Sequence, residues 1–253
     1  MTITFQIASD LHIEYKQNEI PEPTEFITPE AEILILPGDI GSLYKIEQLS
    51  GFLLKVCQMF KIVLYVPGNH EWYHIEPYSQ LSMNALEIRM QKLEQSIDNL
   101  FVLNRNSVII NDVCIAGATL WSDPKCKVPP FIVRIPEMKT NFYKKLHKKD
   151  LKYIESMIDY CQEKNIKLLV VSHHPPTNEV LKYYSNKKNP FVSLYSTNLD
   201  YLLTKNKVNM WICGHTHKNF NFTTKNGTRV ISNQKGKIKD NIRDFNKKFI
   251  ISL

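Results

Sequence analysis

The segment LYVPGNHE, Leu64–Glu71, joins an apolar and largely β-branched run to a Pro-Gly turn and then to three polar side chains. The run has the length and composition of a strand that is buried on both faces of a sheet. After the turn come an amide, an imidazole and a carboxylate, Asn69, His70 and Glu71, which are typical of metal ligands and acid-base groups. The segment therefore predicts a buried strand that ends in chemically competent side chains.

Four other apolar segments end in the same way. The polar residues that follow them are Asp10 and His12 after QIAS, Asp39 after LILPG, His173 and His174 after LLVVS, and His215 and His217 after MWICG. The strand pattern does not choose between His173 and His174. In an open α/β sheet, the carboxyl ends of parallel strands lie along one edge, and ligands bind in the crevice outside it. We therefore expect these residues, far apart in the sequence, to converge on one site.

Two pairs among these residues have the spacing i, i+2. In an extended chain such residues project to the same side. Asp10 and His12 are therefore expected to hold one centre together, and so are His215 and His217.

The converging side chains indicate a metal site. They combine aspartate, histidine and an amide without a thiolate, which suits Mn²⁺, Fe²⁺ or Zn²⁺ better than a calcium cage. About seven ligands are too many for one tetrahedral ion and suit two divalent metal ions. Two neighbouring ions need a bridging carboxylate, and Asp39, alone on its strand end, is the expected bridge.

The N-terminal half predicts a β-α-β arrangement. Its expected strands are Ile3–Ala8, Ile33–Leu36 and Ile62–Val66. Between the last two, apolar residues recur at steps of three and four, which indicates an amphipathic helix over 46–60. A second helical stripe, Leu86–Leu100, is expected to pack in the core rather than against a partner.

The C-terminal half predicts further strands and two hairpins. The expected elements are a hairpin turning at Asn111-Asp112, a helix capped by Asp150, a strand over Leu168–Val171, a short helix near 199–203, a strand over Val208–Cys213, a hairpin turning at Asn226-Gly227 and a closing strand in KKFIISL. Between Trp121 and Lys149 the pattern gives way to prolines, lysines and aromatic residues, which fits either a rim over the site or a plain surface insertion.

The bulk composition is that of a folded α/β protein. The chain has 253 residues, 43% of them hydrophobic and 23% charged, and no repeat or linker, so we expect a single domain over 1–253. The net charge of +7 comes almost entirely from dispersed lysines, which makes nucleic-acid binding possible but weakly supported. Five widely spaced cysteines, together with the lack of an apolar leader or membrane span, predict a cytoplasmic protein without a membrane partner.

The ordered series Asp-x-His, Gly-Asp, Gly-Asn-His-Glu, His and Gly-His-x-His resembles the calcineurin-like metallophosphoesterases, in particular their small single-domain members. The resemblance implies a four-layer αββα sandwich, that is, a mixed β-sandwich flanked by helices. It also implies that one metal is held by Asp10, His12 and His217, that the other is held by Asn69, His173 and His215, that Asp39 bridges them, and that His70 is the acid beside the leaving group.

Two segments depart from patterns in this superfamily. The protein serine/threonine phosphatases continue from Gly-Asp into Val-Asp-Arg-Gly, whereas IGSLY follows Asp39 here, so protein phosphatase activity is not expected. Small members often carry Asn-Pro-x-Gly-Tyr near the C-terminus, where this chain has NQKGK, Asn233–Lys237.

The expected activity is hydrolysis of a small phosphate mono- or diester by a hydroxide that bridges two metal ions. The alternatives are a nuclease and a non-catalytic interaction module on the same fold, as in the retromer subunit that resembles these enzymes. The sequence analysis assigns no chemical role to Glu71.

Overall fold

A computed structural model describes residues 2–17, 19–183 and 189–253 of the chain. Within these residues, one sheet has five strands in the order β11-β1-β2-β3-β4. Strands β1 to β4 run parallel, and β11 pairs antiparallel with β1. The bounds are Thr4–Ile7 for β1, Ile33–Pro37 for β2, Ile62–Val66 for β3, Leu100–Val102 for β4 and Ile250–Ser252 for β11.

The second sheet has six strands in the described ranges, in the order β5-β6-β7-β8-β10-β9. Its inner strands run parallel, and the edge strands β5 and β9 are antiparallel to their neighbours. The bounds are Asn106–Ile110 for β5, Val113–Ala118 for β6, Lys167–Ser172 for β7, Met210–Ile212 for β8, Phe220–Thr223 for β9 and Arg229–Ser232 for β10. The turns at Asn111-Asp112 and Asn226-Gly227 join hairpins, as predicted.

Three α-helices are present in the described part of the chain: α1 (Ile46–Cys57), α2 (Met83–Gln95) and α3 (Thr140–Lys164). Helix α1 lies where the apolar periodicity places it. Helix α2 ends before the predicted stripe does, because Leu100 already begins β4, a strand that the sequence analysis missed. The inward side chains of α2 are buried, as expected of a core helix.

The predicted start of α3 at Asp150 is wrong. The helix begins ten residues earlier, at Thr140, and buries Tyr143 and His147 on its inner face. Asp150 lies inside the helix and accepts a hydrogen bond of 2.7 Å from the guanidinium of Arg105, so its carboxylate is paired with a cation and caps no helix. Lysines 144, 145, 148 and 149, which the sequence analysis assigned to a loop, are helical.

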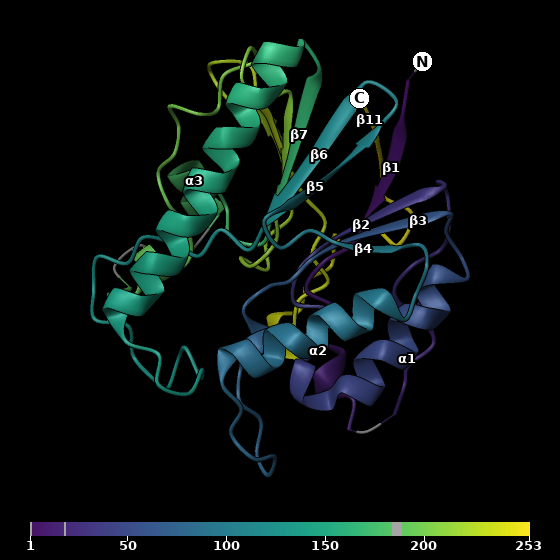
Figure 1. Ribbon diagram of the computed structural model, residues 1–253, viewed down its shortest axis with the longest axis vertical. Coiled ribbons are helices and arrows are strands. Elements are labelled where there is room, and N and C mark those ends of the chain that lie inside the picture. Colours follow the sequence, from purple (N-terminus) through teal and green to yellow (C-terminus); the bar gives the residue numbers. More distant parts are fainter. Residues whose placement is uncertain (1, 18, 184–188) are drawn as a thin grey trace.

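The two sheets pack face to face, and the helices cover their outer faces (Figure 1). Leu34 of β2 belongs to the cluster under α1 and α2, whereas its neighbour Ile35 belongs to the cluster between the sheets. In the second sheet Leu169 faces the same inner cluster, and Val170 packs with Ile154 of α3. This alternation makes four layers, as in the predicted αββα sandwich.

Shorter elements connect these layers. The 3₁₀ turns are Ile13–Tyr15, Pro23–Glu25, Leu43–Lys45, His70–Trp72, Asn178–Tyr183, Val192–Leu194 and Ile238–Asp240. The short helix predicted near 199–203 is wrong, because the chain forms hydrogen-bonded turns there instead. No helix in the described ranges is long and apolar enough to cross a membrane.

Candidate metal centre

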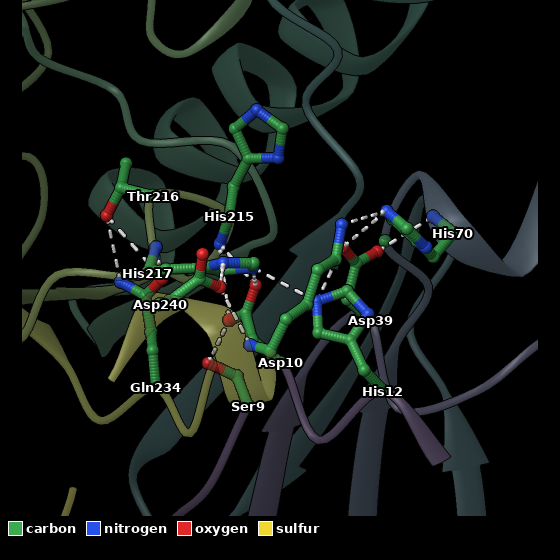
Figure 2. A network of polar contacts seen from close by, with 12 residues as sticks. Ser9, Asp10, His12, Asp39, His70, His215, Thr216, His217, Gln234 and Asp240 are labelled. Atoms are coloured by element: carbon green, nitrogen blue, oxygen red, sulfur yellow. Dashed lines mark hydrogen bonds and ion pairs between the residues drawn. The ribbon is translucent and has the colours of Figure 1, made fainter. Parts of the chain in front are cut away.

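The carboxyl ends of β1, β2, β7 and β8 bring two clusters of ionisable side chains together. In the first cluster, the ligand atoms of Asp10, His12, Asp39 and His217 all lie within 4.8 Å of one another. In the second, the same holds for Asp39, His173 and His215. Figure 2 shows that this network converges from segments far apart in the sequence.

Asp39 belongs to both clusters, and its two oxygens face different ones. Its Oδ2 lies 3.8 Å from Nε2 of His12, and its Oδ1 lies 3.3 Å from Nε2 of His173. The carboxylate is 2% exposed, so protein atoms and not solvent surround it. The sequence analysis singled out this residue as the bridge between two ions, and its position in the structure is compatible with that prediction.

The imidazoles of His12, His173, His215 and His217 share one arrangement. In each ring, the nitrogen that faces away from the cluster lies against an oxygen acceptor. These acceptors are Glu14 Oε1 at 3.0 Å from His12, Pro37 O at 2.9 Å from His173, Leu194 O at 3.2 Å from His215, and Asp240 Oδ2 beside His217. Such an acceptor holds the proton on the outer nitrogen and leaves the inner lone pair for a metal.

The inner nitrogens lie close to one another and to other donor atoms. Nε2 of His12 is 3.0 Å from Nε2 of His217, and Nε2 of His173 is 3.2 Å from Nδ1 of His215. Oδ1 of Asn69 lies 3.0 Å from the same Nε2 of His173. Donor atoms that lie this close together repel one another through their lone pairs unless a cation or a proton lies between them. The residues of the two clusters therefore suit two divalent ions.

The electrostatics of the clusters also favour cations. Burial lowers the pKa of His173, but the negative charge of Asp39 outweighs this effect and raises the pKa to about 9. Burial likewise lowers the pKa of His217, and its contacts with Asp10 and Asp240 raise it to about 9. Each cluster therefore attracts positive charge to the position where a metal ion would replace the proton.

Several of these residues adopt a left-handed backbone, so the extended geometry expected for the i, i+2 pairs is wrong. The φ angles are 54° at Asp10, 51° at His12, 53° at Asp39, 72° at His215 and 50° at His217. This conformation is uncommon for residues other than glycine and is concentrated at functional sites. It places His215 and His217 in different clusters, whereas the spacing alone suggested that they share one.

Two of the glycines that precede these residues are required by close approach. A Cβ atom at position 68 would lie 2.3 Å from Oδ1 of Asp39, and one at Gly214 would lie 2.6 Å from Oδ2 of Asp10. Any side chain at Gly68 would therefore displace the carboxylate that the two clusters share.

The structure separates the two neighbouring histidines that follow β7. His173 joins the cluster with Asp39, whereas His174 packs its ring 4.0 Å from that of His215 and lies 3.3 Å from the carbonyl oxygen of Thr119. Burial and the nearby charge of His173 lower the pKa of His174 to about 3, so its ring is neutral. His174 thus supports His215 sterically.

A family model described as calcineurin-like phosphoesterase matches residues 3–219. The chain belongs to the calcineurin-like phosphoesterase family. The resemblance inferred from the five motifs is thereby confirmed. Membership in this family makes metal-dependent hydrolysis of phosphoric esters the activity to expect.

Similar proteins extend over nearly the whole chain. An uncharacterised protein of Acanthamoeba polyphaga mimivirus is 28% identical over 254 residues, which cover 90% of this chain and 89% of that protein. Two solved structures share the fold. The phosphopantetheinyl hydrolase of Mycobacterium tuberculosis has a TM-score of 0.78 at 17% identity, covering 99% of this chain and 95% of that one. A dimetal phosphatase from Danio rerio has a TM-score of 0.56 at 14% identity, covering 91% and 86%.

His70, which the sequence analysis predicts to be the catalytic acid, lies beside the clusters. Its backbone N–H donates to Oδ1 of Asp39 at 2.8 Å, and its Nδ1 lies 2.9 Å from Oε1 of Glu14. Burial raises the pKa of Glu14, but hydrogen bonds from His12 and His70 outweigh burial and lower it to about 2. The sequence analysis missed Glu14, although it continues the alternate spacing of Asp10 and His12.

Glu71 has a structural role that the sequence analysis did not find. Its carboxylate is buried and accepts hydrogen bonds from the N–H groups of Gly68 at 2.7 Å, Asp39 at 3.1 Å and Ile40 at 2.8 Å. The hydroxyl of Tyr65 donates to it at 2.6 Å. Glu71 therefore ties the turn after β3 to the turn after β2, and so holds Asn69 and Asp39 in register.

A pocket of about 480 Å³ opens over the clusters. It is lined by polar residues that include Asp39, Asn69 and His70, and by apolar and aromatic side chains. Ile132 and Val133 of the proline-rich segment are part of this lining. Of the two alternatives left open for that segment, the rim over the site is therefore the one that the structure supports.

Proposed function

We propose that this protein is a dinuclear metal-dependent phosphoesterase that hydrolyses small phosphate mono- or diesters. The observation that carries the proposal is the position of Asp39, whose two oxygens face two separate sets of converging ligand atoms. One shared carboxylate between two donor sets is the arrangement that a pair of metal ions requires.

In this proposal the two ions are Mn²⁺, Fe²⁺ or Zn²⁺. Asp10, His12 and His217 would hold one ion, Asn69, His173 and His215 would hold the other, and Asp39 would be shared between them. When bound, such ions polarise the phosphoryl group and lower the pKa of a water ligand to roughly 7, which supplies a nucleophile at neutral pH. The contacts of Glu14 with His12 and of Asp240 with His217 hold the outer ring nitrogens, so the inner nitrogens would face the ions.

His70 supplies the proton that the leaving alkoxide or phenoxide needs. Its Nδ1 lies 2.9 Å from the ionised carboxylate of Glu14, which favours a proton on Nδ1 and leaves Nε2 as the atom that faces the pocket. Burial lowers the pKa of His70 despite the nearby carboxylates of Asp39 and Glu14, so the ring holds a second proton weakly, as a proton donor to a leaving group should. The ring lines the pocket beside Asp39 without being one of the ligands named above. It therefore stands where a leaving group would depart.

The cysteines and the pocket bear on the compartment in which the protein acts and on the size of its substrate. All five cysteines are unpaired, which supports a reducing compartment, and we propose that the chain acts in the cytoplasm as a single domain. A pocket of this size suits a small ester better than a nucleic-acid strand.

We predict that the purified protein hydrolyses at least one phosphate ester when Mn²⁺, Fe²⁺ or Zn²⁺ is added, and that a chelator abolishes the activity. The measurement compares p-nitrophenyl phosphate, bis-p-nitrophenyl phosphate, a cyclic nucleotide, a phosphopantetheinyl ester and single-stranded DNA under one metal condition. Turnover of DNA alone would favour the nuclease alternative. Metal binding without turnover of any ester under any of the three metals would contradict the proposal and favour an interaction module.

A further inference from the structure

A loop after β10 carries Lys237 into the pocket. The loop is fastened to His217 on both sides of this lysine. Before it, Oε1 of Gln234 accepts the backbone N–H of His217. After it, Oδ2 of Asp240 lies against Nδ1 of His217 and also accepts the backbone N–H of Lys237 at 2.8 Å. Lys237 is therefore positioned relative to the metal centre and is not a freely moving surface lysine.

The ammonium group of Lys237 points at His70. Its Nζ lies 3.1 Å from Nε2 of His70 and 5.5 Å from the centre of the Tyr15 ring. Among residues 2–17, 19–183 and 189–253, no carboxylate oxygen lies within 4.0 Å of it. The group is a threefold donor beside His70 in the pocket. Its charge helps to lower the pKa of Asp240, but in the described ranges it forms no ion pair with a carboxylate.

The position of Lys237 bears on which phosphate esters the site accepts. A monoester dianion has three non-bridging oxygens, of which two metal ions can hold two. The third oxygen needs another hydrogen-bond donor. A cationic donor binds a charged oxygen more strongly than a neutral donor does. A diester carries a neutral alkoxy group in place of that third oxygen, so the same lysine would meet a poor acceptor.

We propose that Lys237 binds the third non-bridging oxygen of the substrate and thereby makes this site prefer phosphate monoesters to diesters. The inference rests on the proposed phosphoesterase function and adds the substrate class. It also gives a role to the NQKGK segment, which departs from the pattern of the small family members. In the free site the ammonium of Lys237 donates to Nε2 of His70. A substrate oxygen that enters between the two groups would accept from Lys237 in its place, and Nε2 would then be free to take up the proton that it gives to the leaving group.

The test compares two esters that share one leaving group, p-nitrophenyl phosphate and methyl p-nitrophenyl phosphate. For Lys237→Met we expect kcat/KM to fall roughly 10–100-fold on the monoester and less than about threefold on the methyl diester. Lys237→Arg keeps the charge and should retain most of the monoester preference. Lys235→Met removes a neighbouring lysine that does not line the pocket, and it should leave both rates unchanged.

The ratio of kcat/KM for the monoester to kcat/KM for the diester measures how much Lys237 contributes to recognition of the third, charged oxygen. Any effect of Lys237 on His70 cancels in this ratio, because both esters have the same leaving group. The proposal would be overturned if Lys237→Met lowered kcat/KM equally on both esters, or if it lowered kcat/KM on neither.

A second readout does not depend on turnover. Calorimetric titration of the metal-loaded protein with inorganic phosphate should show roughly 10-fold or more weaker binding in Lys237→Met at unchanged metal content. Equal phosphate affinity in the two proteins would contradict the role of Lys237. If the wild-type protein hydrolyses neither ester but this loss of affinity is found, the proposed function fails and the phosphate contact of Lys237 stands.

Discussion

Replacing Asp39 with asparagine is expected to lower kcat/KM for phosphate esters by at least about 10³-fold. Asparagine keeps an oxygen that can accept the backbone N–H of His70, so the turn is preserved. It removes the negative charge and one of the two oxygens that face the clusters. The measurement is steady-state turnover of p-nitrophenyl phosphate together with metal content.

The control is Asp159→Asn, which removes a carboxylate from the exposed face of α3. It should leave turnover and metal content as in the wild type. Full activity in Asp39→Asn would contradict a shared carboxylate. A folded variant with unchanged metal content would contradict it as well.

The second large effect is expected for His70→Ala. General acid catalysis is worth about 10²–10⁴-fold, so we expect a loss of that order on alkyl phosphates, whose leaving groups need a proton. The loss should be much smaller on p-nitrophenyl phosphate, because p-nitrophenolate departs without protonation. The measurement is kcat across a series of leaving groups, with metal content determined for each protein.

This comparison also separates two roles for the ring. His70 lies with His12 and Glu14 in a third group of closely spaced ligand atoms, in which Nδ1 of His12 is 3.0 Å and Nδ1 of His70 is 2.9 Å from Oε1 of Glu14. If His70→Ala loses metal, or if its rate falls equally for every leaving group, His70 is a ligand and not the acid.

The sequence predicted which side chains come together, because the carboxyl ends of parallel strands lie along one edge of a sheet. Asp10, Asp39, His173, His215 and His217 each follow a buried strand, and the strand ends meet at one edge of the two sheets. The family resemblance added the division of these residues into two ligand sets, one for each metal ion. Their roles as ligands stay predictions that the metal measurements below address.

The local geometry was not predictable from the pattern. The spacing argument assumed an extended chain, whereas Asp10 and His12 adopt positive φ angles. Such a conformation is stabilised by contacts from other loops, for example the hydrogen bond of 3.0 Å from the backbone N–H of His12 to the carbonyl oxygen of Asp39. No propensity of a single residue contains that information.

The supporting residues were missed for a related reason. Glu14, Glu71 and Asp240 act through tertiary hydrogen bonds to imidazoles and backbone groups that are distant in sequence. Glu14 carries a weak sequence signal in its alternate spacing after His12, and Glu71 stands in the Gly-Asn-His-Glu motif, but neither signal indicates the hydrogen bonds that the residue makes. The start of α3 was misplaced because Asp150 resembles a helix cap, whereas its pairing with Arg105 allows it to sit inside the helix.

The metal stoichiometry of the folded chain tests the central claim most directly. Metal-free protein is titrated with Mn²⁺, and bound metal is counted by calorimetry and elemental analysis for the wild type, His173→Ala and His217→Ala. The account predicts two ions in the wild type and one in each variant, since each histidine belongs to a different cluster. A single ion in the wild type, or two ions in either folded variant, would contradict a dinuclear centre at these strand ends.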